Sequence, residues 1–119
     1  MDEPIMVDAV TIDCADPGAL AEFWATVRGT EIEWSAGDGP HYMDLKAVHG
    51  GPRLRFQRVP EKKSAKNRLH LDLLAADLEA AVARVEALGG RRAGTFDEYG
   101  FEWIVLADPE GNEFCIATE

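Results

Sequence analysis

The chain has 119 residues, 46% of them hydrophobic, and a formal net charge of −10 at pH 7. This length suits one compact domain, which buries about two-thirds of the unfolded chain's surface on folding. The acidic balance argues against nucleic acid or an anionic membrane as a partner, because excess Lys and Arg bind both. No apolar run approaches the ~20 residues of a membrane span. The two cysteines, Cys14 and Cys115, fit no zinc motif or disulfide framework. We therefore expect a cytoplasmic protein.

One pattern occurs twice. Residues 6–29 and 68–90 each show an alternating strand, an acidic turn, an amphipathic helix and a closing glycine. The turn acids Asp16 and Asp77 are 61 residues apart. Repetition at a fixed offset predicts two copies of one structural unit.

The first copy begins with a predicted strand over 7–14, in which apolar and polar residues alternate. Asp16 can cap the following helix, which runs to Gly29 and carries Trp24 on its apolar stripe, so we expect Trp24 in the core. Three further strands are predicted between turns rich in Gly and Pro, over 31–35, 42–47 and 53–58. The first half is therefore βαβββ.

A basic segment follows from Arg53 to Arg68, with seven basic residues and one acid. It is either a solvated connector or a rim that attracts an anionic ligand. Arg55 lies inside a predicted strand, which favours the second interpretation.

In the second copy, Leu69, Leu71 and Leu73 share one face of a strand, and His70 and Asp72 share the other. Asp77 opens the helix, and the return strands are predicted over 91–95, 103–107 and 113–118. Residues 108–112 read Asp-Pro-Glu-Gly-Asn, which predicts a tight turn and hence a hairpin.

Polar residues fall opposite the large apolar residues of their strands throughout the chain. Both predicted helices are needed on the apolar side, so the polar side stays uncovered. It is either a small-molecule pocket or the wet face of an ordinary antiparallel sheet. The residues expected on this face are Ala9, Thr11, Asp13, Arg55, Gln57, His70, Asp72, Glu113, Cys115 and Ala117.

These features resemble the vicinal oxygen chelate superfamily, and within it the glyoxalase-like domain branch. The resemblance is carried by segments 10–17, 66–73 and 108–115, together with the paired modules. It implies an α+β fold in which two tandem βαβββ modules form a curved, mostly antiparallel sheet with helices on the outer face. It also implies a homodimer. We expect a single domain, 1–119, with modules at 5–59 and 68–119 and a basic connector at 60–67.

Members of this superfamily hold a metal through four strand positions on the open face. The resemblance places Ala9, Gln57, His70 and Cys115 there. Ala9 cannot ligate, so the candidate ligands are His70, Cys115 and Gln57, for a divalent ion such as zinc, nickel, iron or manganese. Absence of any cofactor fits the substituted ligand set equally well.

The open face also supplies candidates for ligand binding and catalysis. Arg55 could pair with Asp72 or Glu113, or could hold a ligand carboxylate or phosphate. A nucleophilic pair of Cys115 and His70 is a weaker alternative, because it lacks a third orienting group. The ligand-binding candidates are Arg55, Gln57, His70, Asp72, Cys115 and Trp103, and the catalytic candidates are His70, Asp72 and Glu113.

Two functions are favoured, and a purely structural or regulatory role also stays open, because fold does not give function. One is a glyoxalase-like lyase or isomerase that acts on a small oxygenated molecule with a metal. The other is a metal-free module that binds a drug or metabolite, similar to the antibiotic-binding resistance proteins of the superfamily.

Overall fold

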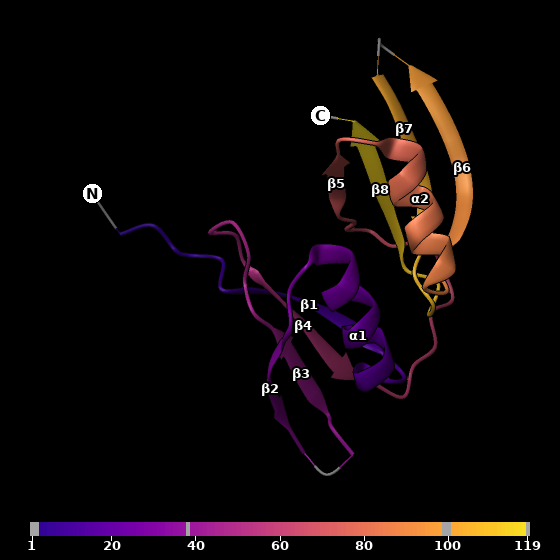
Figure 1. Cartoon of the computed structure of the whole chain (residues 1–119). Coiled ribbons are helices and arrows are strands. Elements are labelled where there is room, and N and C mark those ends of the chain that lie inside the picture. The colour runs from indigo at the N-terminus through magenta and orange to yellow at the C-terminus, as the bar shows by residue number, and fades with distance from the viewer. Residues whose placement is uncertain (1–2, 38, 99–100, 119) are drawn as a thin grey trace. The chain divides into compact units, whose positions relative to one another are not determined.

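The computed structural model describes residues 3–37, 39–98 and 101–118. The chain forms two compact units, Met1–Lys62 and Lys63–Glu119, here called unit 1 and unit 2. In its described residues, each unit contains one helix and one four-stranded sheet (Figure 1). The α+β class and the two tandem modules are therefore confirmed, with two four-stranded sheets described in place of one continuous sheet.

Unit 1 has the element order βαβββ. Its sheet order is β1-β4-β3-β2, in which β1 and β4 are parallel and the other neighbours antiparallel. The elements are β1 (Ala9–Cys14), α1 (Pro17–Arg28), β2 (Ile32–Ala36), β3 (Tyr42–Leu45) and β4 (Arg53–Arg58).

Unit 2 repeats this plan. Its sheet order is β5-β8-β7-β6, again with one parallel pair, β5 and β8. The elements are β5 (Asp72–Ala75), α2 (Leu78–Ala87), β6 (Arg91–Glu98), β7 (Phe101–Ala107) and β8 (Glu113–Thr118).

The first strand of each unit begins later than the alternation predicts. β1 starts at Ala9 rather than at residue 7, and β5 starts at Asp72. The first contact of β5 with β8 is the hydrogen bond that Cys115 N–H donates to the Leu71 carbonyl, at 2.9 Å. His70 therefore lies just before the strand, and Leu69, expected on its apolar face, is 67% exposed.

The duplication extends to the helix caps. Asp16 accepts a hydrogen bond from Ala19 N–H and Asp77 accepts one from Ala80 N–H, both at 3.1 Å. Each carboxylate satisfies an amide that the first helical turn leaves without a partner. The sequence therefore builds the same helix start twice.

Gly29 and Gly90, which follow the two helices at equivalent positions, are needed for different reasons. Gly29 ends α1 in the left-handed conformation, with φ of 65°. At Gly90 the constraint is space, because a Cβ there would lie 2.5 Å from Val85 Cγ1.

Each unit buries the apolar side of its own sheet under its own helix. In unit 1, α1 contacts β2, β3 and β4, and Trp24 is 1% exposed, which confirms its place in the core. In unit 2, α2 contacts β6 and β8. The core of unit 2 is formed by Leu78, Val82, Val85, Ile104, Leu106, Phe114 and Ile116.

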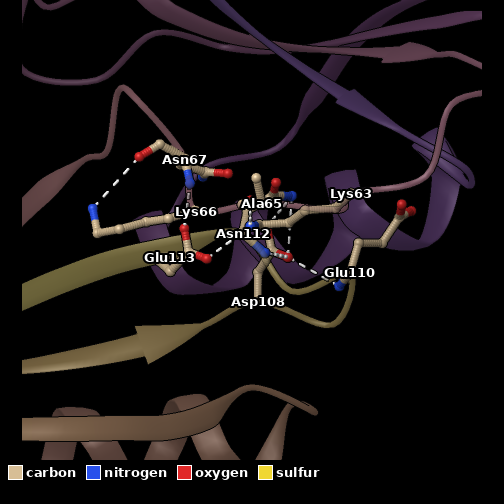
Figure 2. A network of polar contacts seen from close by, with 8 residues as sticks. All are labelled: Lys63, Ala65, Lys66, Asn67, Asp108, Glu110, Asn112 and Glu113. Atoms are coloured by element: carbon tan, nitrogen blue, oxygen red, sulfur yellow. Dashed lines mark hydrogen bonds and ion pairs between the residues drawn. The ribbon is translucent and has the colours of Figure 1, made fainter.

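The predicted turn between β7 and β8 is confirmed and is organised by Asp108, which is fully buried. Its Oδ1 accepts hydrogen bonds from the Glu110 and Asn112 amides, at 2.9 and 3.0 Å (Figure 2). The Asn112 side-chain amide also donates to both carboxylate oxygens, at 3.2 and 3.1 Å. This network sets the register of β8, and with it the position of Cys115.

Replacing Asp108 with Ala should lower the free energy of unfolding by about 2–3 kcal/mol, because part-buried amides of the turn lose their acceptor. Urea unfolding followed by circular dichroism measures the change. Glu61→Ala, at an exposed connector residue, should change it by less than about 0.5 kcal/mol. Equal stability of the two variants would contradict this role of Asp108.

Candidate functional site

The uncovered face of the unit 2 sheet carries two rows of side chains. In the first row Cys115 lies between Asp72 of β5 and Val105 of β7. In the second, Ala117 lies between Leu74 and Trp103. Directly paired residues point to the same side of a sheet, and the alternate residues of β8, Phe114 and Ile116, are buried. The face predicted from alternation is thus present in unit 2, with one row that carries Asp72 and Cys115 and one row of apolar residues.

His70, Asp72 and Cys115 form the polar cluster of this face. One ligand atom from each lies within 4.8 Å of the others. His70 Nδ1 is 3.2 Å from Asp72 Oδ1, and the two side chains are 40% and 74% exposed. The structure therefore brings together three residues that the sequence analysis placed on one face, and all three are open to solvent or ligand.

The surroundings of Cys115 raise the pKa of its thiol and so favour the protonated form. Burial raises the pKa of this thiol, and the negative charge and hydrogen bond of Asp72 raise it further. A thiol with a raised pKa is a poor nucleophile. The environment therefore does not support a nucleophilic pair of Cys115 with His70, although a cation that replaces the proton would find a thiolate ligand.

The cluster meets the donor requirements of an open metal site. Imidazole, carboxylate and thiolate are all zinc ligands, and open zinc sites usually have three protein ligands. Ligand atoms around a tetrahedral zinc ion are about 3.5 Å apart, as metal–ligand distances of about 2.0–2.3 Å require. The ligand atoms of His70, Asp72 and Cys115, which lie within 4.8 Å of one another, are near this spacing.

Glu113 lies at the start of β8 but is bound elsewhere. Its carboxylate is 2.7 Å from Lys63 Nζ and accepts the Asn67 amide at 2.8 Å (Figure 2). Burial alone would raise the pKa of this carboxyl, but the hydrogen bonds from Lys63 and Asn67 outweigh it and the pKa is lowered. Glu113 is therefore ionised at neutral pH and tethers the basic connector to β8. Its catalytic assignment stays a prediction.

In unit 1 the open face is dominated by an ion pair that sequence analysis missed. Arg55 donates to both carboxylate oxygens of Asp44, from Nε at 2.7 Å and from Nη2 at 2.9 Å. Asp44 is 2% exposed. The hydrogen bond to Asp44 raises the pKa of Arg55, against the effect of burial. Arg55 thus forms an internal salt bridge, but with Asp44 rather than with the predicted Asp72 or Glu113.

The sequence does contain a signal that Asp44 has a charged or polar partner. An acid between Met43 and Leu45, in the middle of a predicted strand, is expected to need a partner on its face of the sheet. The ion pair borders a hollow of about 410 Å³ in unit 1. Its lining consists of Glu33, Trp34, Asp44, Arg53 and Arg55.

No helix in the part of the chain that the structure describes is long and apolar enough to cross a membrane.

A comparison with protein-family models matches residues 9–117 to the glyoxalase-like domain. The chain belongs to the glyoxalase-like domain family. The predicted resemblance to the vicinal oxygen chelate superfamily is thereby confirmed. A search of curated proteins gives no match.

Solved structures share the fold at low sequence identity. A glyoxalase/bleomycin resistance protein/dioxygenase family enzyme from Burkholderia phytofirmans PsJN has a TM-score of 0.78 at 21% identity, over 93% of this chain and 96% of its own. Lactoylglutathione lyase from Agrobacterium tumefaciens has a TM-score of 0.69 at 18% identity, over 98% of this chain and 96% of its own. TioX from Micromonospora sp. ML1 has a TM-score of 0.67 at 18% identity, over 95% of this chain and 98% of its own. These similarities establish the fold.

Strand register within this glyoxalase-like chain shows which unit 1 residue is equivalent to Cys115. Thr11 lies 61 residues before Asp72, as the helix caps do. Asp72 pairs with Cys115, whereas Thr11 pairs with Arg55. Arg55, rather than Gln57, is therefore the structural equivalent of Cys115. Gln57 as a metal ligand stays a prediction, and the converging donors of unit 2 do not depend on it.

The Arg55–Asp44 pair should be far more important for stability than the neighbouring Arg53. Arg53 is similarly exposed, but its guanidinium lies 3.6–3.8 Å from Asp8, Glu33 and Asp44. Arg55→Met should lower the free energy of unfolding by about 3 kcal/mol, because it deprives a buried carboxylate of its bidentate partner. Arg53→Met should lower it by less than about 1 kcal/mol. Chemical denaturation measures both, and the reverse order would refute the assignment.

Proposed function

We propose that this chain is a glyoxalase-like protein that binds a divalent metal and a small oxygenated molecule on the open face of unit 2. The observation that carries the proposal is the convergence of His70, Asp72 and Cys115 within 4.8 Å on one sheet face. Family membership supports it, because two of the four strand positions that hold the metal in the superfamily correspond here to His70 and Cys115. Lactoylglutathione lyase is among the proteins of similar fold.

The donor set favours zinc among divalent ions. A thiolate and an imidazole are soft or borderline ligands, which suit zinc better than manganese. Nickel and iron(II) are also compatible with imidazole and thiolate. When bound, such an ion would act as a Lewis acid toward a substrate oxygen.

The residues of the cluster have separate tasks in a lyase or isomerase reaction. Cys115 lies on a strand whose register is fixed by the buried Asp108 turn, so its sulfur provides a rigid ligand. His70 lies before β5, and its 3.2 Å contact with Asp72 orients the imidazole. Asp72 would supply the third, carboxylate ligand beside His70.

The test is metal content per chain after exposure to zinc, nickel, iron(II) and manganese in turn, followed by buffer exchange and elemental analysis. We expect close to one zinc per chain. His70→Ala should reduce uptake to below about a tenth, since an open site that loses one of three ligands binds weakly. His41→Ala changes an exposed histidine of unit 1 and should leave uptake unchanged.

Equal uptake by wild type and the His70→Ala variant would contradict the proposed ligand set. A wild type that retains no ion would contradict metal binding itself.

A metal-free binding module is the second candidate. The observation that favours it lies in unit 1, where Ala9 carries no donor and Arg55, the equivalent of Cys115, is committed to Asp44. Such a module would bind its ligand saturably and return it unchanged, as mass spectrometry of the incubated mixture would reveal. A product peak would exclude it. Assembly as a homodimer stays a prediction, supported by the family resemblance.

A further inference from the structure

The segment that carries His70 has no regular structure of its own. Residues 63–71, all of which the structure describes, belong to no helix or strand. Apolar packing holds little of this segment, because Leu69 is 67% exposed and Leu71 is only partly buried. The position of His70 therefore depends on polar contacts between the segment and its neighbours.

Hydrogen bonds to β8 hold the segment on either side of His70. Three residues before it, Asn67 N–H donates to Glu113 Oε2 at 2.8 Å (Figure 2). One residue after it, the Leu71 carbonyl accepts from Cys115 N–H at 2.9 Å. Glu113 and Cys115 are alternate residues of one strand. The strand that supplies the candidate sulfur ligand therefore also anchors the segment that carries the imidazole.

The Glu113 carboxylate is itself held in place. Its Oε1 lies 2.7 Å from Lys63 Nζ, and each of the two side chains is 23% exposed. Lys63 Nζ also donates to the Ala65 carbonyl. A carboxylate whose one oxygen is bound by an ammonium group can present the other oxygen to the Asn67 amide in a fixed direction. The anchor is thus a network of contacts rather than one isolated hydrogen bond.

Unit 1 has a contact of the same kind at the equivalent position. Arg55 is equivalent to Cys115, as strand register shows. Arg53, two residues earlier on β4, is therefore equivalent to Glu113. The Arg53 guanidinium lies 3.6 Å from Asp8, which precedes β1. In both units, a charged side chain at the start of the last strand thus contacts the segment before the first strand.

We propose that Glu113 is a positioning residue for His70 and acts on it through the Asn67 amide. It keeps the imidazole beside Asp72 and Cys115 before any ion binds. The role of that cluster rests on the function proposed above, whereas the tether rests on the contacts of Glu113. A free segment would have to be ordered when a metal ion binds, and this loss of backbone entropy would weaken binding. Glu113 acts through the backbone and is not itself a ligand.

The test compares Glu113→Ala with Glu113→Gln by two measurements. Zinc affinity, from competition with a chelating dye, should fall about tenfold in Glu113→Ala, as loss of a group that orients a ligand typically causes. Nuclear Overhauser contacts between the His70 ring and the Cys115 β-protons, recorded without metal, should disappear in this variant. Glu113→Gln keeps an oxygen acceptor for the Asn67 amide and should retain both properties. Glu102→Ala, at an exposed residue of β7, is the control and should also retain both.

A second variant separates positioning from stability. Lys63→Glu and Glu113→Lys made together keep an ion pair but place a donor where the Asn67 amide needs an acceptor. The urea midpoint of this charge-exchanged protein should stay close to that of the wild type. Its zinc affinity should fall and its His70 contacts should disappear, as in Glu113→Ala.

Unchanged zinc affinity in Glu113→Ala or in the charge-exchanged protein would overturn the positioning role, as would unchanged His70 contacts. Zinc binding by Glu113→Gln as weak as that by Glu113→Ala would also overturn it. If the wild type retains no zinc, loss of the His70 contacts in Glu113→Ala would support the tether and contradict the metal site.

Discussion

Each four-stranded sheet of this chain has one helix to cover it, and a sheet has two faces. The alternation of strand residues commits Leu54 and Phe56 of β4, like Phe114 and Ile116 of β8, to the covered side. The other side must then carry residues that tolerate solvent or a ligand. The candidate residues on the strands follow this constraint, because Arg55, Asp72 and Cys115 alternate with residues of the covered side.

The two uncovered faces have diverged in chemistry while keeping one architecture. In unit 1, the position on β4 that pairs with Thr11 is occupied by Arg55. Its guanidinium donates hydrogen bonds to both carboxylate oxygens of the buried Asp44. Unit 2 has Cys115 at the equivalent position, beside two exposed donors. The guanidinium of Arg55 is thus bound within unit 1, whereas His70, Asp72 and Cys115 bring three potential ligand atoms within 4.8 Å of one another. Equivalent positions of the two units thus carry an ion pair in unit 1 and the candidate ligand cluster in unit 2.

The fold could be predicted from sequence because its determinants are local: caps at Asp16 and Asp77, alternation, and the turn around Asp108. The site could be predicted only in part. Arg55 and Cys115 are 60 residues apart, one fewer than the caps, so alignment by the caps cannot reveal that they are equivalent. That relation depends on strand pairing between segments far apart in sequence. The partnership of Arg55 with Asp44 is non-local in the same way.

The most direct test of the unit 2 site is the absorption spectrum of the cobalt(II)-loaded protein. Coordination by Cys115 predicts a thiolate-to-cobalt charge-transfer band in the near ultraviolet. The band should disappear in Cys115→Ser and persist in Cys14→Ser, which changes the buried cysteine of unit 1. A band that survives in Cys115→Ser, or none in the wild type, would contradict a metal centre built on Cys115.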